Sequence, residues 1–376
     1  MGTRAAAGGV AVGIAVGWNI ADVGAIATRM ADAYGVGLAV IGLFTTALFV
    51  VHMTMQIPGG RAADRFGARN TALLGTALIL AGNAIAATAP EVPLAIVGRA
   101  VIGLGTGFAF VAGSDYIRAR GGGAFLQGVY GSGSVLAPGI ALLLVPVLAG
   151  PLGFRAPFVG AIVLTAGVLV LLALAPPAPR TARHAGERFD WGFFRDGRLY
   201  RFATIHTASF AFSVIVGNWV VTLLERHGHS KRAAAAAGSL TLLLGFFTRI
   251  YGGSLIGVRR TQVWVATSLV AGGLGAIALA LPLPFVVLVA AAVVIGLAAG
   301  IPFAPAFYGA AVARPDAPGA AVGFVNGWAA FAIVAGTPLV GLTFSLPGDG
   351  RIGFLVVGVL AAGAALATPR TGDMLG

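Results

Sequence analysis

The chain contains no cysteine among its 376 residues, which excludes disulfide bonds, thiolate metal sites and cysteine nucleophiles. It also lacks the glycine-lysine loop that binds nucleotide phosphates, so ATP-driven pumping is not expected. Its apolar segments hold no His-x-x-x-His pair, no paired acids and no Ser/His/Asp set. We therefore expect neither an enzyme nor a site for a metal or cofactor.

Charge is scarce as well, because charged residues make up only 10% of the chain, against about 25% in soluble domains. Hydrophobic residues reach 58% and the mean hydropathy is +0.94, so a lipid bilayer must surround much of the chain. The 58 glycines suit closely packed membrane helices. The net charge of +12 is scattered between apolar runs, which indicates topogenic charge and no nucleic-acid partner.

Twelve apolar runs of about 20 residues are candidate membrane helices. They lie near 6–28, 38–58, 70–89, 93–116, 124–148, 156–175, 201–224, 234–257, 262–281, 284–311, 318–342 and 352–368. Sixteen basic residues fall in the loops expected inside and six in the loops expected outside. We expect a multi-pass protein of the plasma (cytoplasmic) membrane with both termini in the cytoplasm.

The longest polar interruption, residues 176–200, predicts a cytoplasmic linker between bundles of six helices at 1–175 and 201–376. The two halves also resemble one another. Val101-Ile102-Gly103-Leu104 recurs as Val294-Ile295-Gly296-Leu297, and the same shift of 193 carries Gly59-Gly60 onto Gly252-Gly253. The chain is therefore predicted to be a duplicated six-helix unit, an arrangement that places a binding site near the bilayer midplane.

A charged, glycine-punctuated turn joins the second and third apolar runs. Its pattern Gly-x-x-x-Asp-Arg-x-Gly-x-Arg is formed by Gly60, Asp64, Arg65, Gly67 and Arg69. The pattern resembles the signature of the major facilitator superfamily of transporters, although an asparagine follows where a second terminal base is usual. The resemblance implies an all-α membrane protein with twelve transmembrane helices in two pseudo-symmetric six-helix bundles. It also implies a monomeric secondary transporter that works by alternating access.

The same resemblance implies a role for the turn as a conformational latch. Asp64 is expected to dock at the cytoplasmic start of the eleventh run, near Pro318, in the outward-open state. A carboxylate is favoured at the positive end of a helix dipole. Arg65 or Arg69 is then expected to bridge to Asp115 at the inner end of the fourth run. Topogenic charge alone, the alternative reading, accounts for the arginines but not for the acid or the glycines.

Two opposite charges occur inside membrane runs at matching depths. Asp22 and Arg99 each lie roughly six residues from the outer end of their runs, at about 1.5 Å of rise per residue. We predict that they form an ion pair that serves as a proton site, since protonation of the carboxylate frees the guanidinium. The stretch Gly98-Arg99-x-x-x-Gly103-x-Gly105 resembles the fourth-span motif of proton-coupled members of the superfamily. A static pair that only sets helix register is the alternative.

Arg249 is a third charge within the apolar runs, and no acid in its own run is spaced to neutralise it. A buried guanidinium suits a carboxylate or an oxyanion. The setting Arg249-x-x-Gly252-Gly253 resembles the eighth-span motif of the nitrate/nitrite porter branch, which grips its anion with two arginines. Gln56 stands at the position of the other arginine, so the resemblance implies a different or larger anion.

The alternative for Arg249 is that its long side chain snorkels to the inner face of the membrane. Six further polar residues in the runs complete the set of candidate substrate-binding residues: Asn19, His52, Tyr130, Asn218, Tyr251 and Asn326. His52 and Gln56 are four residues apart and share a helix face. A structural hydrogen bond is the alternative role for His52.

Two transport functions remain open at this point. The first is proton-coupled movement of a small polar, anionic solute, which Arg249 favours. The alternative is a proton-driven antiporter that exports a drug or metabolite. Segment 131–141 is a degenerate form of the fifth-span motif of drug antiporters and favours this alternative, together with the Asp22–Arg99 pair. In either case the expected partners are a small-molecule substrate, protons and the bilayer.

Overall fold

The computed structural model describes residues 1–179 and 191–370, and within these ranges the chain is helical and contains no strand. A helix satisfies every backbone donor and acceptor within its own segment, which an apolar chain in lipid requires. The all-α membrane fold predicted from the sequence is therefore confirmed.

Eight helical segments among the described residues are long and apolar enough to cross a membrane, and a ninth is obtained if the bent pair of α3 (Leu38–Thr54) and α4 (Gln56–Phe66) counts as one span. Three expected runs do not appear as spanning segments of their own. The run at 124–148 falls on α7 (Ala124–Leu152), whose last part, from Leu144 onward, forms one segment with α8 (Ala156–Leu174). The run at 234–257 falls on α11 (Lys231–Leu243) and α12 (Gly245–Ser254), and the run at 352–368 falls on the shorter apolar helix Arg351–Ala367. Multi-pass membrane character is thus established, and the count of twelve spans stays a prediction.

The chain divides into two compact units. Unit 1 comprises Met1–Leu126, Gly133–Arg188 and Asp316–Gly323. Its helices are α1 (Thr3–Ala21), α2 (Ala27–Tyr34), α3 (Leu38–Thr54), α4 (Gln56–Phe66), α5 (Ala68–Thr88), α6 (Val92–Ala119), α8 (Ala156–Leu174), most of α7 (Ala124–Leu152), and the short turns η1 (Gly24–Ile26) and η2 (Gly153–Arg155). The first residues of α16 (Pro318–Leu342) also belong to this unit.

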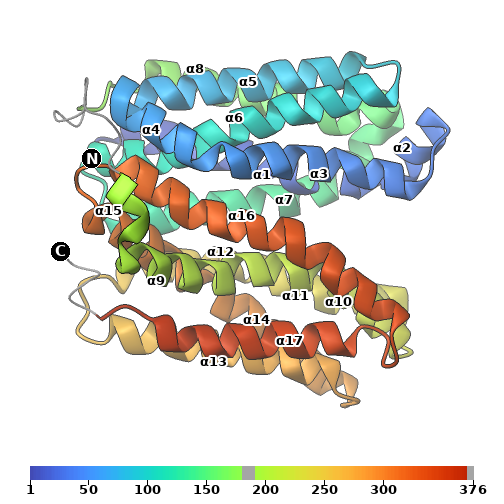
Figure 1. The fold of residues 1–376 in the computed structure, drawn as a ribbon. Coiled ribbons are helices and arrows are strands. Elements are labelled where there is room, and N and C mark those ends of the chain that lie inside the picture. The colour runs from blue at the N-terminus through green and yellow to red at the C-terminus, as the bar shows by residue number, and fades with distance from the viewer. Residues whose placement is uncertain (180–190, 371–376) are drawn as a thin grey trace. The chain divides into compact units, whose positions relative to one another are not determined.

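Unit 2 comprises Gln127–Ser132, Phe189–Pro315 and Phe324–Gly376. Its helices are η3 (Trp191–Arg195), α9 (Gly197–His206), the π-helical turn η4 (Thr207–Ala211), α10 (Phe212–Arg226), α11 (Lys231–Leu243), α12 (Gly245–Ser254), α13 (Thr261–Ala280), α14 (Phe285–Gly300), α15 (Phe303–Ala313), the rest of α16, η5 (Thr343–Ser345), α17 (Arg351–Gly363) and η6 (Ala364–Ala367). Figure 1 shows α13 and α17 running side by side within it. The domain boundaries expected around 176–200 stay a prediction, and residues 180–190 lie outside the described ranges.

A capping aspartate starts α9, and a proline bends the α3–α4 pair. Asp196 caps α9 by accepting a hydrogen bond from the Arg198 amide at 3.0 Å, and bonds from the Arg198 side chain hold the pKa of this carboxyl below its ordinary value. The α3–α4 pair bends by 48°. Pro58 lacks an N–H and clashes with the carbonyl four residues earlier, which is that of Thr54 at the end of α3.

Glycines on facing surfaces allow α5 and α6 to pack backbone to backbone in unit 1 (Figure 1). A Cβ atom added at Gly75 would lie 2.5 Å from Ala109 N, and one added at Gly105 would lie 2.6 Å from Gly75 O. Gly82 and Gly98 interlock in the same way, with an added Cβ 2.7 Å from Gly98 O and 2.9 Å from Gly82 O respectively. Close packing of this kind substitutes for the hydrophobic effect, which does not drive helix association within lipid.

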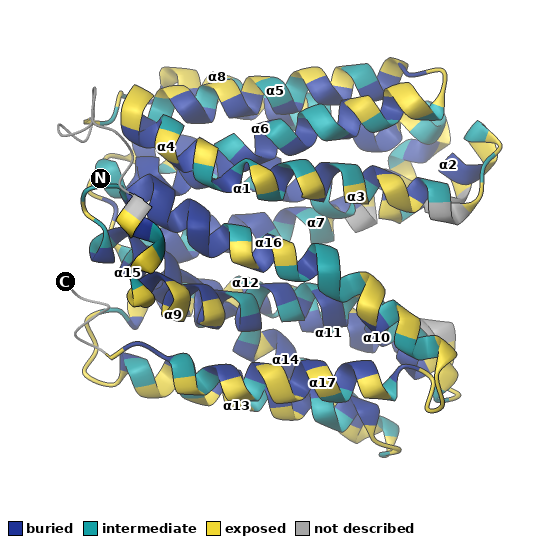
Figure 2. Ribbon diagram, in the orientation of Figure 1, coloured by how far each residue is buried: buried dark blue, intermediate teal, exposed yellow. Residues whose placement is uncertain are grey.

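Each unit has its own buried cluster of side chains, and most helices carry a buried stripe beside an exposed one (Figure 2). In unit 1 the cluster includes Trp18, Phe44 and Phe158, and in unit 2 it includes Leu224 and Phe354. The exposed large hydrophobic residues, such as Val163 and Leu174 in α8, lie on the opposite sides of the helices, as expected of surfaces that meet lipid.

Gly105→Leu is expected to destabilise unit 1 by about 1–3 kcal/mol or more, because the added side chain has no space against the α5 backbone. Gly167→Leu in α8 is the matched control, since a Cβ atom there meets nothing within 4 Å. Unfolding temperatures in detergent measure both variants. Equal temperatures for the two would contradict close α5–α6 packing as a source of stability.

Candidate functional site

A buried ion pair lies at the end of α1 in unit 1. Nη1 of Arg99 lies 3.2 Å from each carboxylate oxygen of Asp22, and both side chains are 0% exposed. Asp22 is the C-cap of α1, and Arg99 lies in the first half of α6. The structure therefore joins the two charges that were paired from their depth in the sequence, while a role in proton transfer stays a prediction.

Backbone carbonyls of two helices, the end of α1 and the middle of α3, hold the guanidinium of the pair. Nη2 of Arg99 donates to the carbonyl of Asn19 at 2.8 Å, and Nε donates to the carbonyl of Phe44 at 3.3 Å. The Asn19 side chain is fully buried and accepts a hydrogen bond from Nδ2 of Asn83 at 2.9 Å. Sequence reasoning missed Asn83; a lone amide within an apolar run was the signal that could have found it.

His52 and Gln56 form a second buried polar group in unit 1. Nδ1 of His52 lies 3.0 Å from Oγ1 of Thr106, and the same hydroxyl oxygen lies 3.1 Å from the carbonyl oxygen of Gly103. The Gln56 side chain donates to the carbonyl of His52 at 3.0 Å. These contacts suit the structural alternative for His52, and its contact with a substrate stays a prediction.

Asp64 caps the first turn of α16. Its two carboxylate oxygens accept hydrogen bonds from the amides of Gly319 at 3.0 Å and Ala320 at 3.1 Å, all within unit 1. The side chain is 7% exposed. A carboxylate here satisfies two amides that no helical carbonyl can reach, and it lies at the positive end of the helix dipole. This is the helix start at which the signature turn was expected to dock.

The two glycines of the signature have separate steric roles. A Cβ atom at Gly60 would overlap the carbonyl of Gly319, so only glycine lets α16 approach closely enough for Asp64 to reach its amides. Gly67 ends α4 with φ of +93°, a conformation that residues with side chains rarely adopt. The spacing of the motif therefore follows from one close contact and one helix end.

The predicted bridge from Arg65 or Arg69 to Asp115 is wrong. Asp115 pairs with Arg118 at 2.7 Å, because residues three apart on one helix are neighbours. Arg69 donates instead to the carbonyl of Leu172 at 3.1 Å and to that of Ala173, at the end of α8. A cation is favoured at a helix C-terminus. The signature therefore places its acid, Asp64, at the N-terminus of one helix and its last base, Arg69, at the C-terminus of another. Arg65 is exposed and lies over the ring of Phe66.

Arg249 of α12 is buried in unit 2 and does not snorkel, since its side chain is 2% exposed. Nη1 donates to the carbonyl of Gly131 at 2.7 Å. Its Cζ atom lies 4.5 Å from the ring centroid of Phe303 and 5.1 Å from that of Phe210. Aromatic faces attract a guanidinium but are neutral, so they stabilise its charge without cancelling it.

Asn326 of α16 contacts a histidine that sequence reasoning missed. Oδ1 of Asn326 lies 3.2 Å from Nε2 of His206, and both side chains are almost fully buried. His206 ends α9, directly before the π-helical turn. A histidine within an apolar run was the available signal, but 120 residues separate it from its partner along the chain.

The remaining candidates are dispersed within unit 2. Tyr130 is fully buried, Asn218 of α10 is exposed, and Tyr251 is 45% exposed with its ring 6.0 Å from that of Trp264. The hydrogen bonds described above for Arg249 and Asn326 are buried inside unit 2.

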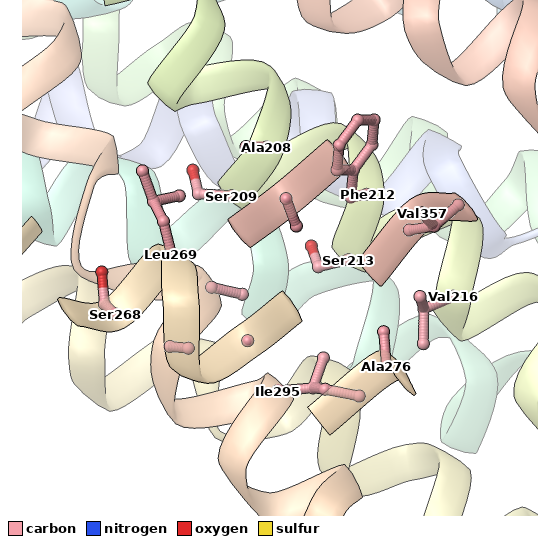
Figure 3. Close-up of a pocket in the computed structure, with 14 residues that line it drawn as sticks. Ala208, Ser209, Phe212, Ser213, Val216, Ser268, Leu269, Ala276, Ile295 and Val357 are labelled. Atoms are coloured by element: carbon pink, nitrogen blue, oxygen red, sulfur yellow. The ribbon is translucent and has the colours of Figure 1, made fainter. Parts of the chain in front are cut away.

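A small cavity of about 30 Å³ lies elsewhere in unit 2, between the π-helical turn and helices α13 and α14. Figure 3 shows the hydroxyls of Ser209, Ser213 and Ser268 at its wall. Each hydroxyl donates to the backbone carbonyl of the residue three positions earlier. The volume suffices for about two water molecules, so this cavity is too small for a solute.

Comparisons with known proteins agree with this architecture. A family model described as Major Facilitator Superfamily matches residues 8–337. No curated protein matches the chain. The proton:xylose symporter bound to 6-bromo-6-deoxy-D-glucose has a similar structure, with a TM-score of 0.77 at 14% identity over 96% of this chain and 94% of that one.

Two further solved structures share the fold. A variant of the E. coli fucose:proton symporter matches with a TM-score of 0.75 and 16% identity over 97% of both chains. The human organic anion transporter MFSD10 (TETRAN) matches with a TM-score of 0.76 and 15% identity, over 98% of this chain and 100% of that one. At these identities the likeness concerns the fold alone.

Asp22→Leu is expected to destabilise the protein by about 3–5 kcal/mol, because it leaves the Arg99 guanidinium buried without its counter-charge. The double variant Asp22→Leu/Arg99→Leu should be more stable than this single variant, since it removes the unpaired charge. Thermal unfolding in detergent measures these two variants and the single variant Arg99→Leu. A double variant whose loss equals the sum of the two single losses would show that the charges are not coupled.

Proposed function

This chain belongs to the major facilitator superfamily, a family of membrane transporters, and on that premise we propose that it carries a small, polar, anionic solute by proton-coupled alternating access. The similar structures belong to transporters named for sugars and for organic anions, so the fold by itself leaves the solute open. The buried side chain of Arg249 is the observation that favours an anion.

Arg249 supplies both charge and directional hydrogen bonding. A guanidinium remains charged in proteins and presents its donors in a planar fork that matches a carboxylate or an oxyanion. Burial strengthens such a contact, because the surrounding dielectric is low. The rings of Phe210 and Phe303 are neutral walls, so a bound anion would bring counter-charge to this site. Asn326 and Tyr130, also buried in unit 2, are proposed as neutral groups that orient the solute.

Proton coupling is proposed at the Asp22–Arg99 pair. Both groups are excluded from water, so protonation of the carboxylate would leave a single buried cation where a neutral pair existed. This change in net charge biases any equilibrium between conformations in which the pair is packed differently. Arg99 also binds the last turn of α1, so a change in the charge of the pair would act on the position of that helix.

The signature turn is proposed to act as a cytoplasmic latch. Asp64 holds the first turn of α16 through two amides, and the remainder of that helix belongs to unit 2. Release of these two bonds is the proposed step that accompanies the inward-facing state. With the basic loops inside, both chain termini are proposed to lie in the cytoplasm.

Efflux of a drug or metabolite by proton antiport is the second candidate. It is favoured by Pro138 within α7, which lies in the degenerate antiporter motif at 131–141. The Asp22–Arg99 pair would serve this function equally well. The two candidates differ in the role of Arg249, which only anion transport requires.

Arg249→Ala is expected to lower flux of the transported anion at least tenfold, because the removed guanidinium is the proposed counter-charge. The measurement is uptake into proteoliposomes of nitrate, nitrite and small carboxylates at several pH values. Arg259→Ala is the matched control, since Arg259 is exposed, and it should keep wild-type flux. Unchanged flux in folded Arg249→Ala protein would contradict the proposed anion site, and drug resistance on overexpression would then favour efflux.

Asp64→Asn is expected to slow transport severalfold while the protein stays folded. The amide side chain retains one acceptor for the α16 amides but loses the charge that the helix dipole favours, a contribution of about 0.3–1 kcal/mol. Asp32→Asn, at an exposed position of α2, is the control and should transport normally. A full transport rate in Asp64→Asn would remove the latch from the mechanism.

A further inference from the structure

A second titratable side chain shares the aromatic surroundings of Arg249 in unit 2. The His206 ring lies 5.6 Å from the ring of Phe303 and stacks 5.5 Å from that of Phe210. The Arg249 Cζ atom lies within 5.1 Å of both of these rings. Phe307 completes the surroundings of His206 at 4.8 Å. Two potential cations are therefore enclosed by the same pair of neutral rings.

The hydrogen bonds of His206 define which ring nitrogen can take up a proton. Nε2 faces the carbonyl oxygen of the Asn326 side chain, which only accepts, so Nε2 carries the hydrogen of the neutral ring. Nδ1 is buried and has no hydrogen-bond partner among the residues that the structure describes. A proton added to the ring therefore binds at Nδ1 and turns it into a donor.

Among the residues that the structure describes, Arg249 is the charged residue that interacts electrostatically with His206. On α15, which packs against α9, Tyr308 is the titratable side chain, and neither α16 nor η6 carries one. The other titratable groups of α9 itself, Arg198, Tyr200 and Arg201, lie near its opposite end. The charge state of Arg249 and of anything bound to it therefore acts on the His206 ring.

We propose that His206 takes up the proton that accompanies an anion bound at Arg249, so that anion and proton bind to unit 2 cooperatively. This inference rests on the proposed anion transport. Without an anion, a protonated imidazole and a guanidinium repel one another in a site with low dielectric. An anion that binds to Arg249 replaces this repulsion by attraction, so it favours protonation, and by linkage protonation favours the anion.

The surrounding backbone supports a functional role for this position. The π-helical turn Thr207–Ala211 starts directly after His206, and π-turns occur frequently at functional sites. It lies between His206 and the helix α10 that follows. The proposed proton site is separate from the Asp22–Arg99 pair of unit 1, where a proton and the guanidinium compete for the carboxylate.

Binding of permanently ionised anions tests the inference, because only the protein then changes charge with pH. Nitrate, methanesulfonate and trifluoroacetate are titrated against purified protein between about pH 5.5 and 8, with thermal stabilisation as the readout. Wild-type affinity is expected to rise up to about tenfold for each unit by which the pH falls, the slope for one linked proton. His206→Gln, which keeps a partner for Asn326, should bind with an affinity that no longer depends on pH.

His229→Gln, at a histidine outside the membrane helices, is the control and should retain the wild-type slope. If the His206→Gln substitution prevents folding, Asn326→Asp serves instead: a carboxylate against Nε2 should shift the fall in affinity to higher pH. Three outcomes would overturn the inference and leave the anion site intact. The wild-type affinity could be independent of pH, the affinity of His206→Gln could keep the wild-type dependence on pH, or the affinity of Asn326→Asp could fall at the same pH as that of the wild type. Absence of anion binding in every protein would overturn the proposed function, and the inference with it.

Discussion

The shortage of water around a buried charge is the constraint on which this structure depends. Each ionisable group in an apolar helix must find its partner within the protein, since lipid offers none. Asp22 and Arg99 meet this requirement with each other and with backbone carbonyls. Arg249 meets it with a carbonyl and two aromatic rings. The first arrangement is an ion pair of opposite charges, whereas the described contacts of Arg249 are with neutral groups.

Helix ends are the other place where the chain uses its few charges. Asp64 binds the amides at the start of α16, and Arg69 binds carbonyls at the end of α8. Both contacts match charge to the helix dipole, and both arise from one short turn between α4 and α5. Gly60 allows α16 to approach α4 closely, and Gly67 ends α4 with an unusual backbone conformation that makes the turn to α5. The signature therefore binds the start of α16 and the end of α8 through residues that lie close together in the chain.

Hydropathy predicted the all-α membrane fold, because composition alone decides which solvent the chain must face. Equal depth in two spans was sufficient to suggest the Asp22–Arg99 pair, and a spaced motif suggested where Asp64 docks. The Arg118 partner of Asp115 lay one helical turn away and outcompeted the expected bridge. His206 and Asn326 could not be joined in advance. The two residues lie 120 positions apart along the chain, and α16 is apolar on nearly all sides, so periodicity does not tell which of its faces meets a neighbour.

The π-helical turn after His206 has a consequence for how this chain tolerates change in length. Such a turn contains one residue more than an α-helical turn requires. Loss of a single residue from Thr207–Ala211 would therefore restore regular winding and leave α9 and α10 in their present rotational register. Elsewhere in a helix the same deletion would rotate everything beyond it by about 100°. A single-residue deletion in this segment would therefore leave the polar side chains of the flanking helices on the faces that they occupy now, without turning them toward lipid.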